Sequence, residues 1–532
     1  MAAPVGPRDD SVTIKFGGGL HTRASEDEID PREAADGQNF LLDPENRELR
    51  PRPPFDLVGT LPNGAEIRGG GSYLKADGTV SFLIQAGDKV YEWDGLSTFT
   101  SRGSVNAGAR LRGHHRSHAW SLDDKLLLTD LALVEPVKEW NGTTFQSVSF
   151  TNELSASFGT FFAKYLVVSN ERALFSHVKD AGATTRHMMV GAKRGDYTQI
   201  TVTNRPSSAL SEEDPFFLLS PDLRPINGHV EAFGTTIIST SQGQIFNLTG
   251  SSAKDFEFLD FYPGSAAFGD ESVAYIGNDI IYGRQGRLES VRDTDRFGDA
   301  ESDDLTFQVA PSIETYSDWA VVYNARLNRI YAFPADQSEV WVMHTAMRGG
   351  ELSPWMRWRT GHELAFRPSF VMSMLDPQDK LEYVFMGDVL GNLYRMEGAG
   401  TAGDGGSSAI TTEWLTKLLS ADLNAQVYDV EGQIKYRKDE AATVTLTPQA
   451  SGFVAFDQAI TINIPAISGR TVYGGGFYYG GAFYGTPFAG RLVKQNFGIP
   501  GQFDDAQLKI SITGTTSFQI NEIKLRFTAA SV

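Results

Sequence analysis

The chain has 532 residues, of which 41% are hydrophobic and 11% aromatic, so it can bury a large core and is not a disordered chain. It has no cysteine, which excludes disulfides, thiolate metal sites and thiol nucleophiles and favours assembly in a reducing cytoplasm. The formal net charge of −19 repels phosphate and argues against a protein that grips nucleic acid. No window approaches the roughly 18 apolar residues of a membrane helix, so we expect no membrane-spanning segment.

Residues 1–72 are expected to form an N-terminal arm that includes the first strands. Within it, Asp30 as N-cap, Pro31 at the first helical position and Gly37 as the stop could enclose one or two turns of helix. Helical signals are sparse elsewhere. The sequence therefore predicts an all-β protein.

From residue 73 to residue 397 one pattern recurs, in which a Gly/Asp/Asn turn joins two β-rich runs. Successive copies, anchored on Ile245, Leu288, Trp341 and Leu393, are 43, 53 and 52 residues apart. Propeller blades repeat at about 40 to 50 residues. We therefore expect a β-propeller of six or seven blades, with a set of stacked β-sandwiches as the alternative fold.

One step between copies is too long for a single blade. The excess, residues 193–230, is interpreted as an insertion or a divergent blade. Insertions in repeat folds map to loops on one face, where binding usually occurs. This segment is therefore a candidate contact surface.

The clearest domain boundary is the Gly/Ser-rich stretch at residues 398–409, which is interpreted as a linker. Residues 410–532 show alternating strands that are typical of a β-sandwich-like domain. Between those strands, residues 474–490 are rich in glycine and aromatic side chains and carry no acidic residue or lysine. We expect this segment to pack on its own domain or on a neighbouring subunit.

Two clusters were weighed as metal sites. In a strand, His114 and His118 would face one way and His115 the other, and nearby arginines would repel a cation. The segment from Asp293 to Asp304 begins like a calcium-binding loop but has a phenylalanine at a ligand position. A calcium ion there stays an open alternative to a solvated acidic loop, and no metal or other cofactor is assigned.

No motif nominates a catalytic residue. The glycine triplets at residues 17–19 and 69–71 complete neither a dinucleotide-binding motif nor a P-loop, and they are interpreted as turns. No GxSxG sequence marks a nucleophilic serine, although a Ser-His-Asp triad stays open because its members are close only in space. The chain is therefore predicted not to be an enzyme.

Several stretches together resemble one protein family. They are residues 16–23 (FGGGLHTR), 29–40 (IDPREAADGQNF), 49–53 (LRPRP), 303–333 and 353–361 (SPWMRWRTG). These stretches, with the C-terminal sandwich pattern, are similar to the β-propeller tail nozzle, tail hub and head-completion (tail-tubular) proteins of short-tailed bacteriophages. One departure is Pro54, where the family usually has glycine after Pro53.

The resemblance implies a structural virion protein that is assembled in the host cytoplasm. Its copies would form a ring, commonly a homo-hexamer, below the portal and the adaptor (head-tail connector) protein. Genomic DNA would leave through the lumen without specific binding, and tail fibres, spikes or a plug would bind below. The candidate assembly contacts are Arg23, Arg50, Arg52, Phe216, Phe217, Phe477, Tyr478, Tyr479, Phe483 and Tyr484.

Two other classes of function remain. The tryptophan and tyrosine content motivates a carbohydrate-binding or carbohydrate-cleaving propeller, which an exposed aromatic pocket with two carboxylates about 5 to 10 Å apart would favour. A cellular propeller scaffold is the third class. The WD or kelch signature expected of such a scaffold is absent from the sequence.

Overall fold

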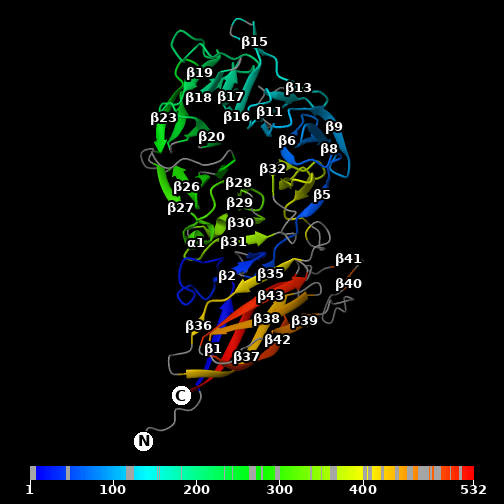
Figure 1. The fold of residues 1–532 in the computed structure, drawn as a ribbon, viewed down its shortest axis with the longest axis vertical. Coiled ribbons are helices and arrows are strands. Elements are labelled where there is room, and N and C mark those ends of the chain that lie inside the picture. Colours follow the sequence, from blue (N-terminus) through cyan, green and yellow to red (C-terminus); the bar gives the residue numbers. More distant parts are fainter. Residues whose placement is uncertain are drawn as a thin grey trace.

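The computed structural model describes residues 8–531 apart from several gaps. The longer gaps are 43–47, 115–124, 263–270, 294–299, 360–367, 399–403, 405–409, 421–424, 438–441, 452–458, 465–477 and 484–492. Figure 1 shows a ring of small sheets above an elongated pair of sheets.

The ring consists of seven four-stranded antiparallel units, here called blades 1 to 7. The first strands of neighbouring blades contact one another, so they are the innermost. Blade 1 has β6 (Ile67–Leu74), β7 (Val80–Ala86), β8 (Lys89–Trp93) and β9 (Phe99–Ser104), and blade 2 has β10 (Leu111–His114), β11 (Leu126–Asp130), β12 (Lys138–Trp140) and β13 (Phe145–Ser147). Blade 3 has β16 (Phe161–Ser169), β17 (Arg172–Asp180), β18 (Ala183–Gly191) and β19 (Phe216–Leu219), and blade 4 has β20 (Ile226–Ala232), β21 (Thr235–Thr240), β22 (Ile245–Thr249) and β23 (Glu257–Tyr262). Blade 5 has β24 (Val273–Ile276), β25 (Asp279–Arg284), β26 (Arg287–Asp293) and β27 (Ala300–Asp304), and blade 6 has β28 (Trp319–Asn324), β29 (Arg329–Pro334), β30 (Glu339–His344) and β31 (Trp355–Arg359). Blade 7 has β32 (Phe370–Leu375), β33 (Glu382–Gly387), β34 (Asn392–Arg395) and β5 (Asp56–Thr60).

Blade 7 closes the ring with a strand from the other end of the propeller sequence. Its outer strand, β5, precedes blade 1 in the chain and pairs antiparallel with β34. Blades 7 and 1 also share an apolar cluster, in which the Phe82 ring lies 4.8 Å from Phe385 and 5.1 Å from Trp93. Ring closure thus joins segments more than 300 residues apart in the sequence.

Blades 1 and 2 meet more closely than an ordinary pair of blades. Their innermost strands form a parallel bridge between Gly70 and Arg112, which joins the two blades into one eight-stranded sheet. A Cβ on Gly71 would lie 2.6 Å from the Cα of Gly113, so only glycine permits this approach. The glycine triplet at residues 69–71, which the sequence suggested was a turn, is instead part of a strand.

The lower part is a β-sandwich made from both ends of the chain. One sheet contains β1 (Arg8–Lys15), β3 (Phe40–Leu42), β4 (Leu49–Pro51), β37 (Ala425–Arg437), β42 (Val493–Phe503) and β44 (Gln519–Ser531). The other contains β2 (Asp36–Gln38), β35 (Thr411–Leu415), β36 (Leu419–Ser420), β38 (Ala442–Ser451), β39 (Ile460–Ile464) and β43 (Asp505–Gly514). The propeller is therefore inserted in the sequence between two groups of sandwich strands.

The remaining described elements are short. Two hairpins, β14 (Phe150–Thr151) with β15 (Ser157–Gly159) and β40 (Tyr478–Tyr479) with β41 (Ala482–Phe483), lie outside the larger sheets. The helical pieces are η2 (Phe307–Val309), α1 (Ala310–Ile313) and η3 (Thr345–Met347). None of the helices within the described ranges is long and apolar enough to cross a membrane.

The predicted all-β fold, a propeller with a sandwich-like domain, is confirmed, and the propeller has seven blades. The N-terminal segment expected as an arm supplies β1 to β4 to the sandwich, and residues 30–37 form turns and a short strand where helical turns were suggested. Residues 193–230, expected as an insertion, include β19 and the first part of β20. Residue 73, where the propeller was expected to begin, lies inside β6.

Candidate functional site at the junction of propeller and sandwich

The stretches that carry the family resemblance meet at one place in the fold. The N-terminal segments 17–22, 39–42 and 49–52 and the segment 305–312 all contact residues 353–359, which include strand β31, where the sandwich meets blade 6. We call this region the junction. It is the candidate functional site because sequence features far apart in the chain converge there.

The first N-terminal segment adds to the outer edge of blade 6. The Gly19 N–H donates to the Ser353 carbonyl at 2.6 Å, and the Leu20 N–H donates to the Trp355 carbonyl at 2.8 Å. A Cβ on Gly19 would lie 1.9 Å from that Trp355 oxygen. The second glycine triplet, also interpreted as a turn, is thus a close backbone contact that covers the edge of β31.

A buried carboxylate holds the turn that follows. Glu33 accepts hydrogen bonds from the Ser353 N–H at 2.5 Å and the Asp30 N–H at 3.3 Å, and it contacts the His21 Nδ1 at 2.8 Å. Its side chain is only 2% exposed. Because a buried carboxylate needs several partners to remain favourable, Glu33 fixes the N-terminal segment against blade 6.

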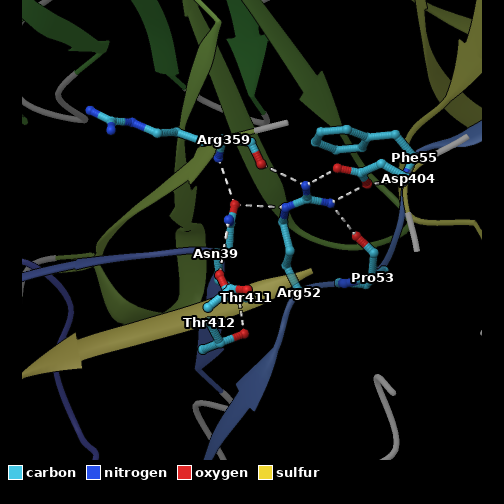
Figure 2. A network of polar contacts seen from close by, with 8 residues as sticks. All are labelled: Asn39, Arg52, Pro53, Phe55, Arg359, Asp404, Thr411 and Thr412. Atoms are coloured by element: carbon cyan, nitrogen blue, oxygen red, sulfur yellow. Dashed lines mark hydrogen bonds and ion pairs between the residues drawn. The ribbon is translucent and has the colours of Figure 1, made fainter. Parts of the chain in front are cut away.

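The centre of the junction is the guanidinium group of Arg52, which Figure 2 shows surrounded by acceptors. Nε donates to the Asn39 Oδ1 at 3.0 Å, and the terminal nitrogens donate to the Pro53 carbonyl at 2.9 Å, the Arg359 carbonyl at 2.6 Å and both oxygens of Asp404 at 2.8 and 2.5 Å. All five N–H groups of the fork therefore have an acceptor. Arg52 is 0% exposed, so these acceptors replace the water molecules that its guanidinium would otherwise bind.

Asn39 ties the same group to the sandwich. Its backbone has φ of +56°, a left-handed conformation that asparagine tolerates better than most residues. In this conformation its Oδ1 also accepts from the Arg359 N–H at 2.6 Å, while its Nδ2 donates to the Thr411 carbonyl at 3.1 Å. Asn39 thus links strand β31 of blade 6 to strand β35 of the sandwich (Figure 2).

Tryptophans complete the junction from the blade side. The Trp358 indole N–H donates to the Phe40 carbonyl at 2.8 Å, and that of Trp355 donates to the Leu305 carbonyl at 2.6 Å. Both indoles are fully buried. The tryptophan-rich stretch 353–361 therefore anchors the N-terminal segments to the propeller core.

Two of the sequence-predicted contact residues at this end of the chain remain accessible. Arg23 is exposed and stacks 3.5 Å from the centre of the Phe307 ring, whose residue is 49% exposed. Arg50 is half-buried on β4. Arg52 was predicted with them as an assembly contact, and that prediction is wrong because its guanidinium is buried within its own subunit.

The other predicted contact residues fall in two groups. Phe216 and Phe217 of β19 are buried in the blade cores, Phe216 against Phe256 with ring centres 4.8 Å apart, so the prediction that they contact a neighbour is also wrong. Tyr478, Tyr479 and Phe483 lie in the hairpin of β40 and β41. Phe477 and Tyr484 lie outside the described residues.

Residues 193–214 are held by an arginine that sequence reasoning missed. Arg172 of β17 is buried and donates to the carbonyls of Ala192 at 2.7 Å, Glu213 at 3.1 Å and Asp214 at 3.0 Å. Burial, with the nearby charge of Arg194, lowers the pKa of Arg172 to about 10. This segment is thus folded onto blade 3, and the Phe217 N–H donates to the Asn204 carbonyl at 2.9 Å, which covers part of the β19 edge.

A second arginine marks the axis of the propeller. Arg112 extends from blade 2 to the carbonyl of Arg68 in blade 1 at 2.8 Å, to the Phe370 ring of blade 7 at 4.9 Å, and to the carboxylate of Glu271 just before blade 5. One guanidinium can contact blades on opposite sides of a ring only from its centre. Side chains therefore occupy the propeller axis at this level.

The described residues include one serine–histidine contact of the kind that the triad hypothesis left open. Ser176 Oγ lies 3.0 Å from His229 Nδ1 between blades 3 and 4. Ser176 is fully buried in the blade, which leaves a substrate no approach to its hydroxyl. The contact is best interpreted as part of the packing between blades.

The two clusters that were considered as metal sites lie partly outside the described residues. His115 and His118, and the centre of the segment from Asp293 to Asp304, lie outside the described residues. Asp304 itself accepts hydrogen bonds from the Thr306 N–H and hydroxyl, both at 2.9 Å. Among the residues described, no group of three or more acidic or histidine side chains is arranged to hold a metal ion.

Comparison with known proteins identifies no family for the chain. No family model and no curated protein matches the chain. Solved structures do match over about two thirds of it. Virginiamycin B lyase from Staphylococcus aureus is 8% identical with a TM-score of 0.41, covering 64% of this chain and 98% of the lyase. The N-terminal domain of Nup159 is 11% identical with a TM-score of 0.38. The match covers 65% of this chain and 95% of the Nup159 domain.

These neighbours correct one prediction. The chain was expected not to be an enzyme, but the similar structures include a lyase, so a fold of this kind does not exclude catalysis. At such low identity the likeness concerns the fold alone. The activity of the lyase is a property of that protein.

Proposed function

We propose that the chain is a tail nozzle or tail hub subunit of a short-tailed bacteriophage. In this proposal its copies form a ring that extends the tail channel below the portal and adaptor and conducts DNA during ejection. The proposal begins from the sequence resemblance. It gains support from the junction, where parts of the resembling stretches 16–23, 29–40, 49–53 and 303–333 contact residues of the stretch 353–361.

That convergence is the observation that carries the proposal. Short motifs scattered over a long chain can match a family by chance. Here Leu20, Asn39 and Arg52 all bond to the same strand, β31, which itself belongs to a resembling stretch. A shared three-dimensional role explains why these residue types occur together in the sequence.

The side chains at the propeller axis and the net charge of the chain bear on the route that DNA would take. Because Arg112 and Glu271 meet at the axis, DNA would pass between subunits of the ring and not along the axis of each propeller. A net charge of −19 keeps the average surface repulsive to phosphate, which suits a conduit that must release its cargo. The adaptor would bind above, and fibres, spikes or a plug would bind below.

The tryptophans, which were part of the motivation for the carbohydrate alternative, do not support it. All seven tryptophans in the described part of the chain are buried, which leaves none of them to form a stacking platform for a sugar. Five of them, Trp140, Trp341, Trp355, Trp358 and Trp414, are fully buried. No specific observation favours this class over the proposed one.

The proposal is tested by the oligomeric state of the purified chain. Light scattering coupled to size-exclusion chromatography, and negative-stain imaging, should show closed rings at high concentration or on addition of the cognate adaptor. A monomer at every concentration, with and without the adaptor, would contradict the proposal.

A further inference from the structure

The chain connects the sandwich and the propeller twice, and the contact between Arg52 and Asp404 joins these two connections. The chain enters the propeller through residues 52–55 and returns to the sandwich through residues 397–410. Asp404 is the single charged residue in the Gly/Ser-rich stretch 398–409, whose composition alone suggests a free linker. In the structure this aspartate is instead held in a buried ion pair.

Asp404 also holds the start of the strand that closes the ring. Its Oδ1 accepts from the Phe55 N–H at 2.9 Å, one residue before β5 begins. The Phe55 ring lies 4.0 Å from the Arg52 guanidinium carbon. The ion pair therefore fixes the position from which β5 enters blade 7 (Figure 2).

Strand β5 is the outermost strand of blade 7 and pairs on one side only. It has four paired positions on β34, interrupted by a register shift, and no strand on its other side within the described sheets. Leu57, the second residue of the strand, is 43% exposed. Its far end is tied by the Leu61 N–H, which donates to the Gly391 carbonyl at 2.8 Å. An edge strand that pairs on one side only depends more than a central strand does on what anchors its ends.

We propose that the Arg52–Asp404 pair is a latch that couples closure of the propeller ring to the sandwich. With the latch formed, Phe55 is fixed and β5 stays in register on β34. With the latch broken, β5 leaves blade 7 more often and the ring opens between blades 7 and 1. This inference does not depend on the proposed virion function.

Hydrogen exchange followed by mass spectrometry tests the latch in the full-length chain. Asp404→Asn removes the charge that pairs with Arg52, and Arg52→Lys keeps a charge but cannot bond five acceptors. In both variants, the amides of β5 and β34 should exchange at least about tenfold faster than in the original chain. The exchange rates of β17 and β18 in blade 3 should be unchanged. Asp379→Asn is the matched control, since Asp379 is an exposed aspartate of the same blade.

Two results would overturn the inference. One is unchanged exchange in β5 when either latch variant is folded. The other is an equal acceleration in all blades and in the sandwich, which would mean general destabilisation. If Asp404→Asn does not fold, the milder Arg52→Lys decides between these outcomes.

Discussion

Gly19 and Trp355 are in direct backbone contact, and there is no room between them for a side chain. A Cβ on Gly19 would lie 1.9 Å from the Trp355 carbonyl oxygen and 2.9 Å from its nitrogen. This contact lets the N-terminal segment cover the outer edge of blade 6. It explains a glycine that the sequence alone presents as part of a turn.

Gly19→Ala should therefore be among the more damaging single changes in the chain. Overpacking against backbone cannot be relieved by a rotamer change, and we expect a loss of on the order of 3 kcal/mol in the free energy of unfolding. Thermal unfolding measures it. Gly108→Ala is the control, because a Cβ there meets only a Val134 methyl at 3.9 Å, and equal losses in both variants would contradict the account.

The close approach of β6 and β10, the innermost strands of blades 1 and 2, leads to a second prediction. Gly71→Ala would place a Cβ 2.6 Å from the Gly113 Cα and push the two innermost strands apart. We expect a loss of about 2 kcal/mol and faster hydrogen exchange in β6 and β10 than in β17. Exchange that is unchanged in β6 and β10 would show that the two blades do not rely on this approach.

The axial ion pair can be tested by removing one charge. Glu271→Gln leaves the nearly buried guanidinium of Arg112 without its carboxylate, and a loss of about 2 kcal/mol is expected. Glu66→Gln is the control, because Glu66 pairs with Arg68 at the surface, where such pairs contribute roughly 0 to 1 kcal/mol. Chemical denaturation compares the two variants. A smaller loss for Glu271→Gln than for Glu66→Gln would count against an axial role.

The pH dependence of stability should reflect Glu139. Burial raises the pKa of this carboxyl, but hydrogen bonds from Tyr197 at 2.5 Å and Gln146 at 2.6 Å, with the charge of Lys125, outweigh burial and hold the pKa below 4.5. The carboxylate therefore contributes stability above about pH 4.5, and that contribution is lost as the pH falls. The melting temperature of Glu139→Gln should lie below that of the original chain at pH 7 and approach it at pH 3. A difference that is the same at both pH values would contradict this assignment.

The fold was predictable because blades repeat a local pattern. Alternating strands and turns at steps of 43, 53 and 52 residues identify a propeller without any long-range information. The junction was not predictable in the same way, because the partners of Arg52 come from residues 39, 53, 359 and 404. Arg52 was taken for a surface contact since a charged residue in an apparent arm is usually exposed. The one available signal was Asp404, a lone charge in an otherwise uncharged linker.

The prediction that the phenylalanines of β19 are assembly contacts was wrong for a different reason. Phe216 and Phe217 follow a polar loop, and the sequence could not show that the fourth strand of blade 3 begins there. An apolar pair at the end of an apparent insertion resembles a docking feature. This interpretation changes once the pair is assigned to the outer strand that blade 3 needs to be complete. Counting four strands for every blade would have assigned these residues to the core.

The most direct test of the central proposal is the location of the chain in particles from its native source. Antibody fragments raised against the folded chain, imaged on purified particles by electron cryomicroscopy, should decorate a closed ring at the tail, below the portal. Absence of the chain from the particles, with all of it recovered as a monomer in the soluble fraction of the host, would contradict the proposal.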